Sequence, residues 1–233
     1  MQYFGGKSRI AKKLGAELQS RLKPNQAFVD LFCGSCNIVS NVKAEKRVAN
    51  DIHPQLMAMH KAVQNGWIPP EVVTEEDYKL AKTSGEDHVK GFVGFGCSFG
   101  GRYFEGYARA IQTQRNFALA AKTSILKKHT RMRDVIFTCQ SYDELQLDSE
   151  SLIYCDIPYR GTKWFSGTKK FNHDDFYSWA KNAKAVGHTV LISEYAEGVP
   201  EGFEVVWQVE SQKLMKNSAG IRVETVEVLM QPK

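Results

Sequence analysis

The first fifty residues combine a helical pattern with two short apolar runs. Apolar side chains recur every four positions from Ile10 to Leu22, which predicts an amphipathic helix with Ser8 as its N-cap. The run from Ala27 to Phe32 predicts a buried strand, and Arg47 to Asn50 predicts a second one. Helices that alternate with buried strands are typical of an α/β fold with a largely parallel sheet.

The middle of the chain has weaker periodicity. Residues 53–90 look helical and mixed, with a break at Pro69-Pro70. From Gly91 to Tyr107 glycines alternate with aromatic residues, which indicates either a loop with exposed rings or a buried helix followed by a loop. A helix is expected from about Glu105 to Lys128, because its apolar positions fall on one side.

The last hundred residues return to strands. One helix interrupts them, and we expect Asp174 or Asp175 to cap it and the helix to end near Ala185. The final two strands are expected to pair as an antiparallel hairpin around residues 213–220. The predicted strands of this part are Val135–Cys139, Leu152–Tyr154, Thr189–Ser193, Phe203–Val209 and Val223–Met230.

A glycine turn follows the first predicted strand. Residues 33–37 contain one glycine, so they lack the dinucleotide fingerprint, and no Gly-Lys-Ser/Thr follows that would make a P-loop. A helix is expected from about Ile38. Asp30 ends the strand, and Asp51 lies about 20 residues beyond it at the next strand end, where an acid accepts hydrogen bonds from ribose hydroxyls. This arrangement predicts a nucleoside ligand without an obligatory phosphate pocket.

A second set of polar groups follows the strand at Leu152–Tyr154. It consists of Asp156, Ile157, Pro158 and Tyr159, at a strand end where open α/β sheets bind ligands. The Asp156 carboxylate and the Ile157 carbonyl are two acceptors, and the Tyr159 ring is a stacking surface. Together they suit a flat heterocycle with an amino group. The alternative is a strand followed by an ordinary proline turn.

The segment before the first helix contains two glycines and a lysine. Gly5 and Gly6 allow the backbone to pass close to a ligand. Lys7 places a cation at a helix start, where the helix dipole gives no reason for one. This indicates a functional role for Lys7, with an exposed surface lysine as the alternative.

Composition excludes several classes of protein. The chain has 233 residues, 42% of them hydrophobic, which is enough for a full core in one or two domains. It has no apolar run of about 18 residues and no signal-peptide pattern at its start, so we expect no membrane span. Five scattered cysteines indicate free thiols in a reducing cytosol. Cys33 and Cys36 form a C-x-x-C without a second pair at zinc spacing, so no metal site is expected.

Positive charge is concentrated in one segment. Between Arg102 and Arg133 there are eight Lys or Arg and one acid, Glu105, so the segment is +7 and the remainder of the +5 chain sums to −2. A basic segment in an otherwise nearly neutral protein suggests a polyanion partner. Tyr103 and Tyr107 next to basic groups suit a nucleic-acid backbone with base contacts. The alternative is a solvated helix face.

The motifs, in order and spacing, resemble those of the Dam family of DNA adenine methyltransferases. Tyr3-Phe4-Gly5-Gly6-Lys7 is similar to the family's N-terminal cofactor motif, and residues 30–34 are similar to its glycine-turn motif. Residues 156–159 resemble the catalytic Asp-Pro-Pro-Tyr, and the resemblance extends over nearly the whole chain. Two departures stand out: Cys36 replaces a motif glycine, and Ile157 replaces the first proline.

The resemblance implies a three-layer, Rossmann-like methyltransferase sandwich with a mostly parallel seven-stranded sheet. Residues 1–52 and 134–233 would form the catalytic domain, and residues 53–133 an inserted, mainly helical target-recognition region. Asp156, Ile157, Pro158 and Tyr159 would be catalytic. S-adenosylmethionine would be bound by Tyr3, Phe4, Gly5, Lys7, Asp30, Phe32, Cys33, Gly34, Ser35, Asp51, Ile52, Ser141, Tyr142 and Asp156. DNA would be bound by Arg102, Tyr103, Tyr107, Arg109, Arg115, Lys127 and Lys128.

The reaction implied is methyl transfer to the exocyclic amino group of adenine in double-stranded DNA, after the base has been flipped out of the duplex. The resemblance also implies a cytoplasmic monomer or weak dimer of bacterial, phage or mobile-element origin. Two alternatives remain open. One is an rRNA adenine methyltransferase, which Asp156 disfavours, and the other is a non-catalytic DNA-binding protein on a methyltransferase scaffold.

Overall fold

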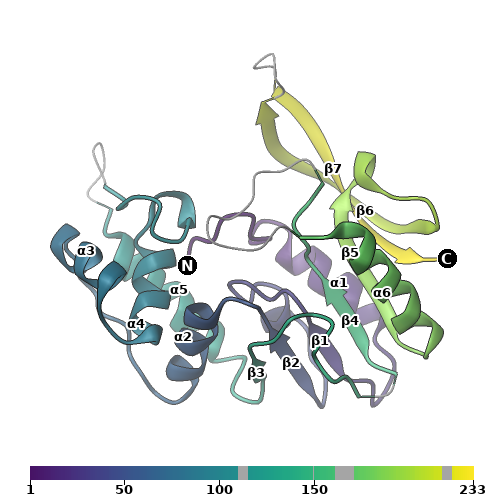
Figure 1. Cartoon of the computed structure of the whole chain (residues 1–233), viewed down its shortest axis with the longest axis horizontal. Helices are drawn as coiled ribbons and strands as arrows, with labels where there is room; N and C mark the ends of the chain where they lie inside the picture. Colours follow the sequence, from purple (N-terminus) through teal and green to yellow (C-terminus); the bar gives the residue numbers. More distant parts are fainter. Residues whose placement is uncertain (110–114, 149, 161–170, 217–221) are drawn as a thin grey trace.

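Seven strands form one sheet in the order β3-β2-β1-β4-β5-β7-β6 (Figure 1). The computed structural model describes residues 1–109, 115–148, 150–160, 171–216 and 222–233, and the side chains at 211–216 and 222–225 lie outside this description. The strands are β1 (Phe28–Asp30), β2 (Arg47–Asn50), β3 (Ile136–Thr138), β4 (Leu152–Cys155), β5 (Thr189–Tyr195), β6 (Phe203–Lys216) and β7 (Arg222–Pro232).

The first five strands run parallel, and β7 lies antiparallel between β5 and β6. This arrangement confirms the expected Rossmann-like sandwich with a mostly parallel seven-stranded sheet. Every predicted strand is present, and all except β6 begin and end within a few residues of the expected positions. The closing hairpin is longer than the pattern indicates, and its predicted turn lies partly outside the described residues.

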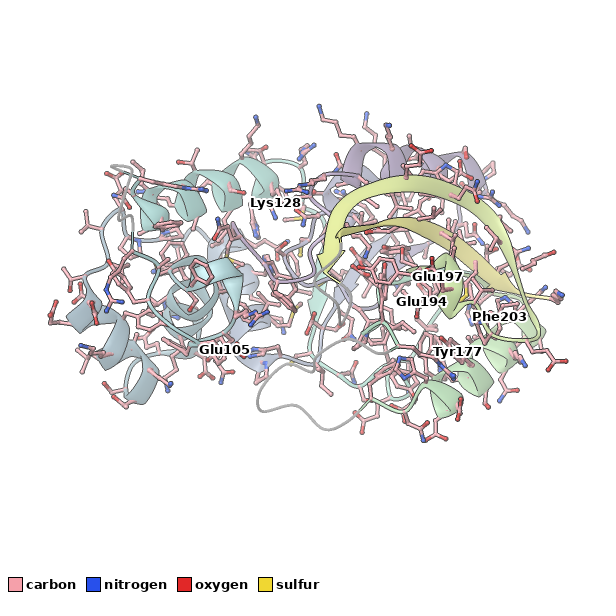
Figure 2. The ribbon with its side chains drawn as sticks, turned by 90° about the horizontal axis from the view of Figure 1, so that it is seen from above. Glu105, Lys128, Tyr177, Glu194, Glu197 and Phe203 are labelled. Atoms are coloured by element: carbon pink, nitrogen blue, oxygen red, sulfur yellow. The ribbon has the colours of Figure 1, made fainter. Side chains whose placement is uncertain are left out.

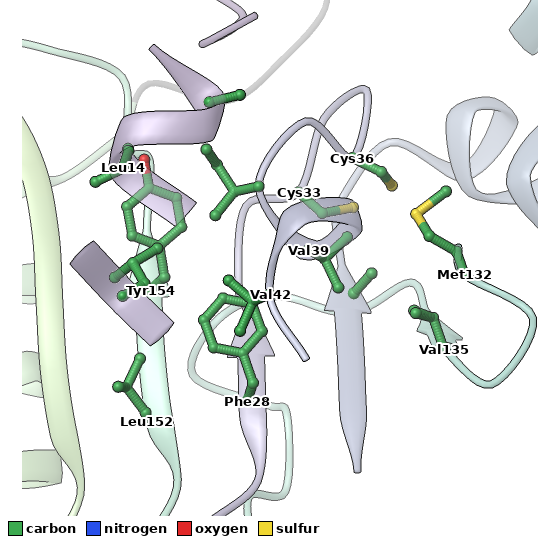
Figure 3. Close-up of a cluster of buried hydrophobic side chains, with 14 of the residues drawn as sticks. Leu14, Phe28, Cys33, Cys36, Val39, Val42, Met132, Val135, Leu152 and Tyr154 are labelled. Atoms are coloured by element: carbon green, nitrogen blue, oxygen red, sulfur yellow. The ribbon is translucent and has the colours of Figure 1, made fainter. Parts of the chain in front are cut away.

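Helices α1 (Ala11–Arg21) and α6 (His173–Ala185) cover opposite faces of the sheet. Leu152 and Tyr154 of β4 pack with Leu14 of α1 in one buried cluster, which Figure 3 shows in close-up. Ile153, between them in the strand, packs with Phe176 of α6 in another. Successive side chains of a strand point to opposite faces, so a continuous apolar run is what a strand covered on both sides requires.

The chain between β2 and β3 forms a separate helical region, on the left in Figure 1. Its helices are α2 (Pro54–Gln64), α3 (Glu75–Thr83), α4 (Asp87–Gly91), a π-helical turn η2 (Phe92–Gly96), a short 3-10 turn η3 (Phe99–Gly101) and α5 (Phe117–His129). They share their own hydrophobic cluster, which includes Phe92, Phe95 and Ile125. Met1 and Tyr3 pack against that cluster, so the start of the chain links the two parts.

Several helix boundaries differ from the sequence prediction. Helix α1 begins at Ala11, after turns at residues 8–10, and Ser8 does not cap it. In place of a helix from Ile38 there is one 3-10 turn, η1 (Val39–Asn41). Helix α5 begins at Phe117, and the stretch that follows Glu105 is not helical where the structure describes it.

Local capping explains where α5 and α6 begin, and for α6 the cap is Asn172 in place of the expected Asp174 or Asp175. The side chain of Asn116 accepts a hydrogen bond from Leu119 N–H, which fixes the start of α5. The side chain of Asn172 accepts from Asp174 N–H and Asp175 N–H, so Asn172 caps α6 and the two aspartates occupy its first turn. Acids in the first turn of a helix still interact favourably with its dipole.

Candidate active site

Two strand ends meet at the centre of the sheet, where the strand order reverses. Strands β1 and β4 are parallel neighbours, and Leu31 N–H donates to the Tyr154 carbonyl at their carboxyl ends. Asp30 and the residues from Asp156 onwards therefore lie at the same edge. Doubly wound sheets bind ligands at this switch point.

The loop after β4 is anchored on several sides. The Ile157 side chain is buried in the cluster beneath α6, and the Pro158 carbonyl accepts a hydrogen bond from His173 Nε2 at 2.7 Å. The Asp156 side chain is 21% exposed. The loop thus holds one partly accessible carboxylate on an otherwise buried support.

Lys7 lies within the same group of side chains. Its Nζ is 2.8 Å from Asp156 Oδ1 and 3.6 Å from Glu227 Oε2 of β7, and it donates a hydrogen bond to the Tyr159 hydroxyl. Burial alone would lower the pKa of Lys7, but Asp156, Tyr154 and Glu227 raise it above its ordinary value. Lys7 is only 4% exposed, so the alternative of a surface lysine is wrong.

The Tyr159 ring is largely covered. Lys7 Nζ lies 4.4 Å from its centroid, and the Tyr195 ring meets it edge-on at 4.5 Å. The ring was expected to be a stacking surface for a base. Lys7 and Tyr195 both contact the ring in this structure, and stacking of a base on Tyr159 stays a prediction.

The turn after β1 has the backbone geometry of a close-approach loop. Gly34 and Cys36 have φ values of 47° and 57°, in the left-handed region that favours glycine. Cys36 thus keeps the conformation although it replaces a motif glycine. A Cβ on Gly34 would lie 2.8 Å from the Tyr3 ring, so Tyr3 packs directly over the turn.

Two acids support this turn. Asp51 accepts hydrogen bonds from Gly34 N–H at 2.9 Å and from His53 N–H at 3.0 Å. Asp30 Oδ2 accepts from Val39 N–H, whereas Asp30 Oδ1 has no hydrogen-bond partner among the described residues. Burial raises the pKa of Asp30 well above its usual range, and the nearby Cys36, Asp156 and Asp51 add to this.

The far side of the turn is held from the helical region. His60 Nε2 of α2 lies 3.1 Å from the Gly34 carbonyl oxygen, and Lys128 Nζ of α5 donates to the Ser35 carbonyl and the Asn37 side chain. Figure 2 shows Lys128 between the helical region and the sheet. Lys128 is 8% exposed, so its predicted contact with DNA phosphate does not fit this structure.

The remaining predicted cofactor residues differ in their exposure and contacts. Ile52, after Asp51, is 63% exposed. The ring of Tyr142, after β3, is tilted against the Phe32 ring, with 6.1 Å between the centroids. Ser141 Oγ donates to Asp143. The centroid of the Phe4 ring lies 4.2 Å from the Arg102 guanidinium carbon. The backbone N–H of Phe4 donates a hydrogen bond to the Gly101 carbonyl. Gly5, at φ 77°, has open space where a Cβ would be.

The predicted DNA-binding residues differ in their exposure and in their contacts with other side chains. Arg109 forms a two-pronged ion pair with Glu75, and the Tyr107 hydroxyl donates to the Val73 carbonyl. Tyr103 packs against His53 and Phe95. Lys127 and Arg115 are exposed, and Arg115 lies over the Phe117 ring.

Sequence reasoning did not identify Glu227, Glu194 or His60. Glu227 and Glu194 are 3% and 1% exposed on neighbouring strands, although acids are seldom buried without a reason. A single acid inside the apolar stretch Val226–Met230 was the available signal for Glu227. No local pattern marks His60.

A family comparison gives a direct match. Residues 3–93 match the family model of D12 class N6 adenine-specific DNA methyltransferases. This confirms the resemblance to DNA adenine methyltransferases that the motifs indicate. The matched range contains the N-terminal motif, the glycine turn and Asp51, and it ends before the basic segment.

Individual relatives are more distant. The chain is 24% identical over 208 residues to the type II methyltransferase M.FokI of Planomicrobium okeanokoites, covering 77% of this chain and 31% of that protein. The chain therefore spans about a third of the length of this curated relative. Among solved structures, a putative methylase from Haemophilus influenzae matches with 9% identity and a TM-score of 0.40, covering 96% of this chain and 88% of that one. A putative rRNA-methylase from Clostridium thermocellum matches with 11% identity and a TM-score of 0.41, and the match covers 95% of this chain and 96% of that one.

Proposed function

We propose, from the match of residues 3–93 to the family model of D12 class N6 adenine-specific DNA methyltransferases, that this chain transfers a methyl group from S-adenosylmethionine to the exocyclic amino group of adenine in DNA. The observation that carries this proposal is the partly exposed Asp156 carboxylate, held by Lys7 at the switch point beside the glycine turn. A nucleoside-binding edge and an acceptor for an amino group are thus adjacent, as the reaction requires.

The residues present fit S-adenosylmethionine. Asp51 uses one lone pair of each oxygen for the backbone and retains acceptor sites for ribose hydroxyls. The unpartnered Asp30 Oδ1 is a further acceptor at the same turn. Ile52 offers an exposed apolar side chain next to Asp51 for the flat purine. The Tyr3–Lys7 segment and residues 32–35, 141 and 142 complete the proposed binding set.

The bound cofactor supplies a methyl group on a positively charged sulfur. The amino nitrogen of adenine is a weak nucleophile, because its lone pair is delocalised into the ring. The Asp156 carboxylate and the Ile157 carbonyl accept the two amino hydrogens and so localise the lone pair on nitrogen. Fixed acceptors that interact more strongly as positive charge develops on that nitrogen lower the barrier. Solvent then takes the excess proton.

Double-stranded DNA is the proposed partner. Its adenine amino group is paired, so the base must leave the stack to reach Asp156. The exposed cations Lys127 and Arg115, together with Arg102 and Arg109, would contact phosphates, with Tyr103 and Tyr107 close to the strand. Residues 53–133 are proposed as the target-recognition region, with a hydrophobic cluster of their own.

We further propose a cytoplasmic protein that acts as a monomer or weak dimer in a restriction-modification or related bacterial or phage system. Among the described helices, none has the length and apolar character needed to cross a bilayer.

The experiment is a methyl-transfer assay with labelled S-adenosylmethionine, supplied with duplex DNA, single-stranded DNA and ribosomal RNA in parallel. We expect label in duplex DNA, recovered as N6-methyladenine after enzymatic digestion. Label only in RNA would favour the rRNA alternative. Cofactor binding by calorimetry without transfer to any nucleic acid would overturn the proposed reaction, and absence of both would leave a DNA-binding scaffold.

A further inference from the structure

We propose that Glu227 is a positioning residue, which shares Lys7 with Asp156 and thereby gives the site a net negative charge and leaves the Asp156 carboxylate available to the target amino group. The inference rests on the proposed methyl transfer. It concerns a residue of the last strand, outside both motifs and outside residues 3–93.

The geometry places Lys7 between two carboxylates. Its Nζ is 2.8 Å from Asp156 Oδ1 and 3.6 Å from Glu227 Oε2, and the side chains of Lys7 and Glu227 are 3% and 4% exposed. Glu227 reaches this place because β7 pairs with β5 in a register that sets it opposite Tyr195. The Tyr195 ring contacts Tyr159, so Glu227 lies immediately behind the catalytic loop.

The charge count explains what Glu227 adds. Lys7 and Asp156 alone would form a neutral pair. In that pair the Lys7 ammonium group would interact with the Asp156 carboxylate that is proposed to accept the amino hydrogen of the substrate. With Glu227 as a second carboxylate, one positive charge faces two negative charges, and the group is left at −1. Charges interact more strongly in a buried site than in water. A net negative site favours a cation, whether on the cofactor sulfur or on the methylated nitrogen.

A purely structural role gives no reason for an acid at this position. Burying a carboxylate is costly unless it is paired, and Glu227 is followed in the strand by three buried apolar residues, Val228, Leu229 and Met230. The ion pair with Lys7 offsets part of the cost of burying the Glu227 carboxylate. The retained acid is therefore explained by the site it faces.

Other titratable groups surround Glu227. Lys7 comes from the N-terminal segment, Asp156 and Tyr159 from the loop after β4, and Glu194 and Tyr195 from β5. Glu194 is a further buried acid near the same tyrosines. Figure 2 shows it in the part of the molecule that carries the β6–β7 hairpin. The pH dependence of the reaction must therefore be measured separately in variants of Glu227 and of Glu194.

The test compares Glu227→Gln with the wild-type protein in two ways. Calorimetry measures the preference for S-adenosylmethionine over S-adenosylhomocysteine, which lacks the positive charge. We expect this preference to fall about tenfold in Glu227→Gln. In steady-state transfer to duplex DNA, kcat should fall at least about tenfold with little change in the KM for DNA. The acid limb of the pH profile should move to lower pH, because removal of a neighbouring negative charge lowers the pKa of Asp156.

Matched variants separate charge from packing. Glu204→Gln makes the same change at an exposed position of β6 and should behave as wild type. Glu227→Asp retains the charge and should retain the cofactor preference within about twofold, even if Glu227→Gln does not fold. A loss of preference in Glu227→Asp, or an unchanged preference and pH profile in folded Glu227→Gln, would overturn the inference. Wild-type protein that binds the cofactor but methylates no nucleic acid would instead overturn the proposed function, and the binding preference would still test Glu227.

Discussion

The Lys7 ammonium nitrogen lies 2.8 Å from Asp156 Oδ1, which joins the segment before the first helix to the loop after β4. Glu227 and Tyr159 complete the contacts of this lysine. Three stretches that are distant in sequence therefore fix one carboxylate.

Asp156→Asn should abolish methyl transfer and leave cofactor binding in place. The amide has nearly the same shape, but it lacks the negative charge that stabilises the developing positive nitrogen. Removal of one such preorganised electrostatic contact typically costs about 100- to 1000-fold in kcat. Single-turnover transfer to duplex DNA, together with calorimetry of the cofactor, measures both effects. Asp148→Asn, at an exposed ion pair with Lys46, is the control. A wild-type rate in Asp156→Asn would exclude the proposed mechanism.

Lys7→Met should destabilise the fold as well as the reaction. It leaves the Glu227 and Asp156 carboxylates close together without their cation, and loss of one partner from a buried ion pair costs about 3 kcal/mol or more. Urea denaturation measures the free energy of unfolding. Lys12→Met, on the exposed face of α1, should change it by less than about 0.5 kcal/mol. Equal stabilities for the two variants would contradict the structure.

Gly101→Ala should be far more damaging than Gly100→Ala. Both glycines have positive φ, 69° and 65°. A Cβ at Gly101 would lie 2.6 Å from the backbone of Gln2 and Tyr3, whereas a Cβ at Gly100 would meet open space. Gly100→Ala should therefore cost about 1 kcal/mol of backbone strain, and Gly101→Ala clearly more. Thermal unfolding of the two variants provides the comparison, and similar melting temperatures would show that the N-terminal segment does not pack on this loop.

Glu194 should make stability depend on pH. Burial raises its pKa to about 7, above the value of 4.5 expected in the unfolded chain. The folded protein then binds this proton more tightly, so the stabilisation is complete below pH 4.5 and is lost as pH rises to about 7. The shift corresponds to about 3 kcal/mol. The difference in free energy of unfolding between wild type and Glu194→Gln, measured from pH 5 to 8, should follow this course. Parallel curves would mean that Glu194 titrates normally.

Arg115→Gln should weaken DNA binding without affecting the cofactor. One lost phosphate contact reduces the slope of log K against log salt by about 1. Fluorescence anisotropy at several salt concentrations measures the slope. Lys13→Gln, an exposed charge on α1 away from the helical region, should leave it unchanged. An equal slope in all three proteins would remove Arg115 from the proposed DNA-binding set.

Local patterns predicted the sheet and the motif positions well. Buried strands such as Leu152–Cys155 appear as continuous apolar runs, because both faces of the sheet are covered. Asp30 and Asp156 were correctly placed at strand ends, since those ends follow from the same runs. What these residues contact did not follow from local patterns.

The misjudged features depend on distant residues. Lys128 counts as one more charge in a basic segment, but it is buried because the turn at Ser35 and Asn37 offers oxygen acceptors to it. The stretch after Glu105 has apolar residues at helical spacing, yet α5 starts at Phe117, where Asn116 caps it. The pairing of Lys7 with Glu227 depends on the register of β7 against β5, which no local pattern specifies.

The strand latest in the chain lies inside the sheet, between β5 and β6, so β6 has no hydrogen-bonded neighbour until β7 is in place. Contacts between residues far apart in sequence are slow to form, because a large loop must close before they contribute. Glu227, the acid that contacts Lys7, belongs to this strand. Completion of the cluster of Lys7, Asp156 and Glu227 therefore requires β7, and a nascent protein that has formed only its first five strands lacks one of these three side chains.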